Sequence, residues 1–217
     1  MDIRIDNTIK ALEKNNIKGI YAENKAEVLH IVKSMLFGGA KITNGGSMSV
    51  VESGVLDVIN SGEYNYLDRS RAGITAEEQL EVYKSVLDSD FYFCSANAVT
   101  EDGQLINVDG NCNRISAISF GPRKVIMIVG ANKIVKDINE GFLRVKKIAA
   151  PKNSVRLSVD TPCAKLGHCV SLLKSDNPDI TDGCNKKDRI CASYMISGRQ
   201  RVKDRINVII CGENLGY

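Results

Sequence analysis

Hydrophobic residues recur at helical spacing in several stretches of the chain, and polar capping residues precede them. An N-cap side chain followed three residues later by a glutamate satisfies free backbone N–H groups at a helix start. This spacing occurs at Asn24, Thr75 and Asp137 and predicts a helix after each, and a further helix is expected near Ser49. The apolar stripe after Asn24 consists of Val28, Ile31, Val32 and Met35, and the stripe after Thr75 consists of Leu80, Tyr83 and Leu87.

Short apolar segments between these helices have the character of buried strands. They cover residues 40–43, 91–94, 125–129 and 206–212. Continuous apolar runs are typical of parallel strands covered on both faces. Residues 98–108, AVTEDGQLINV, instead predict a hairpin in which Asp102-Gly103 supplies the turn. The pattern therefore predicts an α/β fold with an open, mainly parallel sheet flanked by helices.

Composition and charge are those of an ordinary globular protein. Hydrophobic residues make up 43% of the 217 residues, charged residues make up 25%, and the net charge is +3. We expect one domain over residues 1–217, with residues 161–204 as an irregular, cysteine-rich, basic extension packed on it. The opening MDIRIDNTIK has no apolar signal core, and no uncharged run is long enough to span a bilayer, so we expect a cytoplasmic protein.

The first candidate site is the glycine-rich segment after the strand at residues 40–43. It consists of Asn44, Gly45, Gly46 and Ser47. Glycines let a ligand approach the backbone closely, and the N–H groups at a helix start favour negative charge. Ligands of open α/β sheets also bind beyond the carboxyl ends of the strands. The segment could therefore bind a small anionic ligand, and a plain tight turn is the alternative.

The second candidate is TEDGQLINVDGNCN, residues 100–113, which contains no Lys or Arg. Glu101 follows a buried strand and could act as a nucleophile or a general base. Gly103 lies in the turn, and Asn111 and Asn113 precede a helix whose N–H groups would face the same space. The absence of cations favours backbone N–H groups as the partners of an anion. A solvated hairpin is the alternative interpretation.

The third candidate is a set of four of the seven cysteines, namely Cys163, Cys169, Cys184 and Cys191. Four thiolates can hold zinc or an iron–sulfur cluster, and His168 could serve as an alternate ligand. The spacing, C-x5-C and C-x6-C separated by fourteen residues, is wider than that of compact CxxC pairs, so buried free thiols are the alternative. Cys94 and Cys211 lie in apolar strands and are expected in the core, whereas Cys112 could be a reactive thiol.

Residues 186–205 are rich in Lys and Arg, which allows a third class of function, a non-catalytic module that contacts nucleic acid. No interleaved aromatic residues or recognition motif accompany this basic segment. A solvated surface is the simpler interpretation, and the sequence argues against a nucleic-acid partner.

Several of these segments together resemble one known family. They are NGGSMSVVESG, SANAVTEDGQLINVDGNCNRISAISFGPRKVIMIVG, TPC…GHC…GC…DRICASYMI and the closing RINVIICGENLGY. In this order they resemble the LUD domain family, which includes lactate-utilization protein C. The resemblance implies a fold similar to that of ribose-5-phosphate isomerase, glucosamine-6-phosphate deaminase and the CoA transferases. In that superfamily a glycine-rich loop after a strand meets a phosphate or CoA-type ligand, as expected here for residues 44–47.

The resemblance also implies a role in the bacterial oxidation of lactate to pyruvate, alongside iron–sulfur partner proteins. Class I CoA transferases use a glutamate in a Glu-Asn-Gly motif, and Glu101-Asp102-Gly103 looks similar but carries Asp in the middle. An acyl or CoA transferase-like enzyme using Glu101 is therefore the alternative function. Many relatives carry a cysteine cluster similar to this one, but the loop between Cys169 and Cys184 is longer here.

Overall fold

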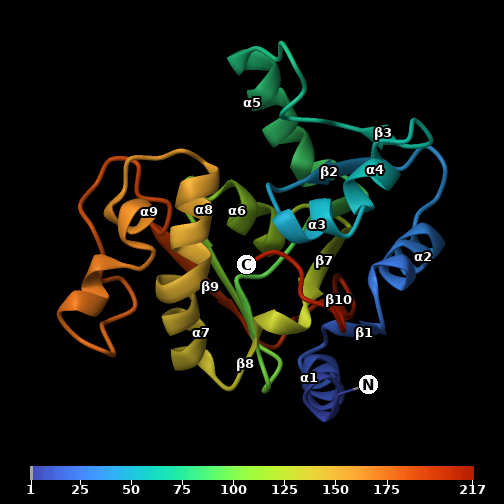
Figure 1. Ribbon diagram of the computed structural model, residues 1–217. Coiled ribbons are helices and arrows are strands. Elements are labelled where there is room, and N and C mark those ends of the chain that lie inside the picture. The colour runs from blue at the N-terminus through green and yellow to red at the C-terminus, as the bar shows by residue number, and fades with distance from the viewer. Residues whose placement is uncertain (1) are drawn as a thin grey trace.

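The computed structural model describes residues 2–217 and contains two β-sheets surrounded by helices (Figure 1). The larger sheet has six strands in the order β1-β10-β7-β4-β2-β3. They are β1 (Lys18–Ala22), β10 (Ile206–Cys211), β7 (Lys124–Gly130), β4 (Phe91–Cys94), β2 (Lys41–Asn44) and β3 (Asn65–Tyr66). Every pair in this sheet is parallel. The predicted α/β fold with an open, parallel sheet flanked by helices is confirmed.

Helices cover both faces of the larger sheet, which explains the continuous apolar runs of its strands. One face packs against α1 (Ile3–Lys14) and α6 (Asn113–Ser119), and the other packs against α2 (Lys25–Met35), α3 (Met48–Glu52) and α4 (Val55–Ile59). Alternate residues of β7 enter the two cores: Val125 and Met127 join the first, and Ile126 and Ile128 join the second. A strand buried on both faces needs apolar side chains at every position.

The smaller sheet has four strands in the order β8-β5-β6-β9. They are β8 (Ile134–Val135), β5 (Ala98–Thr100), β6 (Leu105–Asp109) and β9 (Ser193–Ser197). The predicted hairpin is confirmed, because β5 and β6 pair antiparallel around Gly103, whose φ is +75°. The expectation of an irregular segment over residues 161–204 is wrong in part, because β9 pairs with β6.

A long helical stretch covers the outer face of the smaller sheet. It runs from α7 (Ile138–Arg144) through a π-helical turn, η3 (Val145–Ala149), into α8 (Ala150–Arg156). Phe142, Val145 and Ala150 pack against Ile106 and Val108 of β6. The short helices α9 (Pro162–Leu166) and η4 (Val170–Leu173) follow and lie on the outer side of α8 (Figure 1).

The predicted helix starts are confirmed at all three capping residues. The side chains of Asn24, Thr75 and Asp137 accept the backbone N–H three residues on. The helix expected near Ser49 is α3, which Ser47 caps. The remaining helical turns are η1 (Val86–Asp88) and η2 (Ala131–Lys133).

Helix α5 (Ala76–Ser85) departs from the expected packing because it projects away from the sheets (Figure 1). Leu80 is 53% exposed and Leu87, which lies in η1, is 50% exposed, so the predicted apolar positions do not form a buried face. Its buried residue is Val82 instead. A capping pattern therefore located the helix, but its apolar spacing did not identify the face that packs.

Within residues 2–217, none of the helices has the length and apolar character required to cross a bilayer.

Candidate functional site

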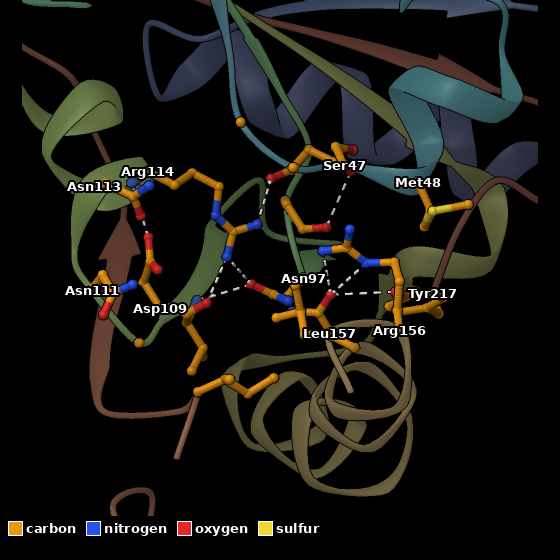
Figure 2. A pocket seen from close by; sticks show the side chains of 18 of the residues that line it. Ser47, Met48, Asn97, Asp109, Asn111, Asn113, Arg114, Arg156, Leu157 and Tyr217 are labelled. Carbon is orange, nitrogen blue, oxygen red and sulfur yellow. Dashed lines mark hydrogen bonds between the residues drawn. The ribbon is translucent and has the colours of Figure 1, made fainter. Parts of the chain in front are cut away.

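A cavity of about 220 Å³ lies beyond the carboxyl ends of β2 and β4 (Figure 2). Its walls come from the glycine-rich loop after β2, the segment after β4, the end of β6 with the start of α6, the end of α8 and the C-terminal Tyr217. Parallel strands present their carboxyl ends at one edge of the sheet, and this edge is the usual position of ligand sites in α/β folds. We call this cavity the basic cavity.

The glycine-rich loop forms one wall because its glycines leave room for arginine side chains. A Cβ atom on Gly46 would lie 3.0 Å from the Nη2 atom of Arg69 and 3.5 Å from that of Arg156. A Cβ atom on Gly45 would lie 2.8 Å from the Tyr92 hydroxyl and 3.6 Å from the Arg114 side chain. The loop therefore contacts three guanidinium-bearing side chains that are distant from it in sequence.

The cationic side chains that line the cavity are Arg69, Arg114, Lys133 and Arg156. Within residues 2–217, none of them forms an ion pair with a carboxylate. Neutral groups hold them instead: Arg69 donates to the Tyr83 hydroxyl at 3.1 Å, and Arg156 donates to Asn153 Oδ1 at 2.7 and 2.9 Å. In Figure 2 the guanidinium groups of Arg114 and Arg156 point toward each other from α6 and α8.

Arg114 is held by three acceptors that carry no formal charge. Its guanidinium donates to Asn97 Oδ1 at 2.9 Å, to the Val108 carbonyl at 2.6 Å and to the Ser95 carbonyl at 3.4 Å. Asp109 is the one acidic residue of the lining, but its Oδ2 atom accepts the backbone N–H groups of Arg114 and Ile115. The acid therefore fixes the start of α6 and leaves the guanidinium charge uncompensated.

Lys133 lies at the inner end of the basic cavity and is 3% exposed. Its Nζ atom donates to Ser49 Oγ at 2.8 Å and to Ser95 Oγ at 3.1 Å, which links α3 to the end of β4. The pKa of Lys133 is lowered to about 7, first by burial and then by the guanidinium groups of Arg144 and Arg114. Burial without a counter-ion disfavours the charged amine, and an anion in the cavity would reverse that preference.

Arg144 adds a further buried cation behind the cavity. It is 7% exposed, and its guanidinium donates to the backbone carbonyls of Asn97 and Asn132. Burial lowers its pKa to about 10. The positive charge of this region thus extends from the cavity wall into the core beneath it.

The structure brings together most of the ligand-binding residues predicted from the sequence. Those that line the basic cavity are Gly45, Gly46, Ser47, Asn111 and Asn113. Asn44 lies at the end of β2, where its Oδ1 atom accepts the Tyr66 hydroxyl at 3.0 Å. Gly103 lies outside the lining and packs against the backbone of Ala11 and Leu12 in α1.

Glu101 also lies outside the cavity lining. It occupies the β5–β6 turn, where its Oε1 atom accepts a hydrogen bond from Arg4 Nε at 3.0 Å. The Glu101 side chain is 39% exposed. Glu101 therefore forms a surface ion pair and does not line the basic cavity.

The four cysteines predicted as a set line a second, smaller cavity on the outer side of α8, together with Lys146 and Tyr194. We call it the cysteine cavity. In residues 2–217 no three His, Cys, Asp or Glu side chains are arranged as the ligands of a metal ion. His168 does not line this cavity. Cys94 and Cys211 are completely buried in strands, as expected, and the Cys112 thiol donates to Ser193 Oγ.

Sequence reasoning missed the cations of the basic cavity and expected backbone N–H groups in their place. Arg69 follows β3, Lys133 ends η2 and Arg156 ends α8, so no local motif connects them. Arg114 is the neighbour of the predicted Asn113. Its position in the loop between a strand and a helix was the signal that could have identified it as a site residue. The others converge only through the order of strands in the sheet.

Fold and cavity together define an α/β protein with a parallel sheet whose carboxyl edge carries a strongly basic cavity. The chain belongs to the LUD domain family, because the family model matches residues 5–211. A solved structure described as a DUF162 family protein from Deinococcus radiodurans is 17% identical, with 88% of this chain and 100% of that chain covered and a TM-score of 0.31. A comparison with curated proteins gives no match.

Proposed function

We propose that the basic cavity binds a small molecule with two or more negative charges, such as a phosphate ester, and that the chain serves lactate oxidation or a related redox pathway. The observation that carries this proposal is the convergence of Arg69, Arg114, Lys133 and Arg156 on one cavity. Within residues 2–217 these side chains have no carboxylate partner in an ion pair. Lys133 is buried and Arg69 and Arg114 are half-buried, and charges removed from water are costly unless they are paired. A bound anion would pair these charges and could also contact the exposed Arg156.

The charge balance favours a polyanion over a monocarboxylate. The lining carries four cations and a single acid, Asp109, which is already bonded to two backbone N–H groups. A single carboxylate such as lactate would leave most of this positive charge uncompensated. A phosphate ester offers several acceptor oxygens, which suits forked guanidinium donors. The cavity volume of about 220 Å³ is below the usual range for drug-sized ligands, which indicates a small metabolite.

Membership of the LUD domain family supports the pathway part of the proposal, because the family includes proteins of lactate utilization. The alternative of a transferase with Glu101 as nucleophile gains no support, because Glu101 is paired with Arg4 outside the cavity. The alternative of a nucleic-acid module also gains none. In the basic segment, Arg189, Arg199 and Arg205 donate to backbone carbonyls.

Titration calorimetry with inorganic phosphate, glycerol 3-phosphate and L-lactate tests the proposal. We expect the phosphate compounds to bind, lactate to bind at least tenfold more weakly, and added salt to weaken all binding. Affinity should also fall as the pH rises through about 7, because an anion favours the protonated form of Lys133.

A pair of variants separates the cavity from general surface charge. The double variant Arg69→Gln/Arg156→Gln should lower phosphate affinity at least tenfold. The matched control is Arg123→Gln, because the Arg123 side chain is 81% exposed and lies outside the cavity lining. Equal affinities for the double variant and the control, or no binding of any phosphate compound, would contradict the proposal.

A further inference from the structure

The four cations that line the basic cavity comprise three guanidinium groups and one amine, that of Lys133. A guanidinium keeps its proton, whereas a buried amine can lose its proton and then carries a nucleophilic lone pair. Lys133 is also the most deeply buried of the four, with 3% of its surface exposed. We propose that its Nζ atom forms an imine with the carbonyl carbon of a phosphorylated aldehyde or ketone in this cavity, with Ser95 carrying the proton. This inference rests on the proposed anion site and names the class of phosphate ester that it takes.

The hydrogen bonds of Lys133 all go to neutral oxygen atoms. Its Nζ atom lies 2.8 Å from Ser49 Oγ, 3.1 Å from Ser95 Oγ and 3.5 Å from the Ala96 carbonyl. Within residues 2–217 it forms no ion pair with a carboxylate. A carboxylate would hold the proton on the amine, whereas a hydroxyl can accept from the ammonium group and donate to the neutral amine. These bonds therefore allow both protonation states that an imine-forming lysine passes through.

The two hydroxyl groups beside Lys133 differ in position. Ser49 is completely buried and lies outside the cavity lining, and its hydroxyl donates to the Leu215 carbonyl at 3.1 Å. It therefore accepts from Lys133 and holds the Nζ atom in place. Ser95 follows β4 and lines the cavity. Its hydroxyl hydrogen can turn from the Ala96 carbonyl, at 3.3 Å, toward the amine or toward a ligand oxygen, so this hydroxyl is the group that reaches both.

Imine formation needs the ligand and these two side chains. The lone pair of the neutral Lys133 amine forms a C–N bond with the carbonyl carbon, and the electron pair of the C=O π bond moves to the oxygen. Ser95 passes one hydrogen of Nζ to that oxygen, which gives a carbinolamine. The C–O bond then breaks, the second hydrogen of Nζ leaves with the hydroxyl as water, and a C=N bond remains. The carbon keeps its oxidation state throughout.

Arginine side chains beside the glycine-rich loop provide a separate place for the phosphate. A Cβ atom on Gly46 would lie 3.0 Å from Arg69 Nη2 and 3.5 Å from Arg156 Nη2, so both guanidinium groups reach this loop. Forked guanidinium donors suit the oxygens of a phosphate group. The same cavity, of about 220 Å³, contains Lys133 at its inner end. A short ligand with a phosphate at one end and a carbonyl group near the other would meet both.

The surroundings of Lys133 favour the neutral amine in the empty cavity. Burial lowers the pKa of Lys133 to about 7, and the guanidinium groups of Arg144 and Arg114 act in the same direction. Glu52 and Cys94 act in the opposite direction. Bound phosphate favours the ammonium form, so affinity should fall as the pH rises. Imine formation in a saturated cavity should instead become faster, because it starts from the neutral amine.

Reduction with borohydride in the presence of dihydroxyacetone phosphate, followed by peptide mass mapping of the whole chain, tests the inference. Hydride converts an imine to a stable secondary amine, and we expect one adduct per chain, at Lys133. Two lysines serve as internal controls: Lys146 is equally buried but lies outside the lining, and Lys152 is exposed. Glycerol 3-phosphate, which has no carbonyl group, should bind without forming an adduct.

Calorimetry on the same chain separates this inference from the anion site. A chain that binds the phosphate compounds but gives no adduct, or gives as much adduct at Lys152 as at Lys133, would overturn the inference and leave the anion site standing. A chain that binds no phosphate compound would overturn both.

Two variants and a pH series test the roles of the side chains. Lys133→Met should abolish the adduct. Ser95→Ala keeps the lysine, so it stays informative even if Lys133→Met fails to fold. Timed quenching with borohydride should show imine formation at least tenfold slower in Ser95→Ala, with glycerol 3-phosphate affinity within threefold of the parent. In the saturated parent, the rate should rise at least threefold between about pH 6 and pH 8. Equal rates in Ser95→Ala and the parent, or a rate that falls with pH, would overturn the inference.

Discussion

The basic cavity and the cysteine cavity lie along one helical stretch, η3 and α8, yet their walls differ in chemistry. Both contain a buried lysine, Lys133 in one and Lys146 in the other, and neither forms an ion pair with a carboxylate of residues 2–217. The basic cavity surrounds its lysine with arginines, hydroxyls and amides, which suit hard oxygen anions. The cysteine cavity surrounds its lysine with thiols and apolar side chains and encloses only about 20 Å³. The comparison teaches that a buried lysine alone does not make an anion site, because the volume and the neighbouring cations differ between the two cavities.

The largest expected effect comes from Gly130→Ala, which should damage the basic cavity alone. A Cβ atom at Gly130 would overlap the backbone nitrogen of Leu215, so the C-terminal segment that carries Tyr217 must shift. We expect a loss of about 3 kcal/mol in the free energy of unfolding, measured by urea denaturation. Phosphate affinity, measured by calorimetry, should fall with it. Gly198→Ala is the control because its Cβ atom meets open space.

Arg114→Gln should have the next largest effect, and it tests the basic cavity directly. The variant removes donations to Asn97 Oδ1 and to the Val108 carbonyl, and it removes one cation from the basic cavity. We expect phosphate affinity to fall between tenfold and a hundredfold, about 1.4–2.7 kcal/mol. Calorimetry measures this loss. An affinity equal to that of Arg123→Gln would show that Arg114 does not contact the anion.

Lys133→Met should change the pH dependence of stability. The pKa of Lys133 is lowered to about 7 in the folded chain, from 10.5 in its ordinary state. Between these two values the unfolded chain binds one more proton than the folded chain, so stability should rise with pH in this window. The slope is at most about 1.4 kcal/mol per pH unit. Urea denaturation at pH 7.5 and 9.5 should show this rise in the free energy of unfolding with pH in the parent and not in Lys133→Met.

Glu101→Gln should have the smallest effect, and it tests the transferase alternative directly. The Arg4–Glu101 ion pair is half exposed on both sides, so its loss should cost at most about 1 kcal/mol. Phosphate affinity should stay within twofold of the parent. A loss of phosphate binding in this variant would restore Glu101 to the site and contradict the assignment of the anion site to the basic cavity.

Local signals in the sequence predicted the elements better than the site. Asn24, Thr75 and Asp137 marked helix starts because capping depends on residues only three apart. The apolar run in β7 revealed a strand buried on both faces for the same local reason. By contrast, Leu80 and Leu87 have the spacing of a stripe but remain exposed, whereas Val82, which lies outside that spacing, is the buried residue of α5. The spacing of apolar residues does not show which elements pack together, because that depends on the topology of the fold.

The candidate site shows the same difference between local and long-range information in the sequence. The loop at Gly45 and Gly46 was predictable because a strand, a glycine pair and a helix are contiguous in sequence. Arg69 and Arg156 could not be predicted, since they are brought to Gly46 by elements that are far apart along the chain. The four cysteines were grouped by residue type and separation, and they line one cavity with the buried Lys146, which carried no local signal. Their role as metal ligands stays a prediction.

The π-helical turn at Val145–Ala149 sets the rotation of the helix that lines both cavities. A π-turn adds one residue to a helix, which rotates everything after it by about 100° relative to a regular α-helix. Lys146 and Ala150 face the cysteine cavity, and Asn153 and Arg156 face the basic cavity. Ala150, Asn153 and Arg156 all follow the turn, so deletion of one residue between Lys146 and Ala150 would rotate the three together relative to Lys146. The extra residue of the turn therefore sets the direction in which α8 presents its side chains to both cavities.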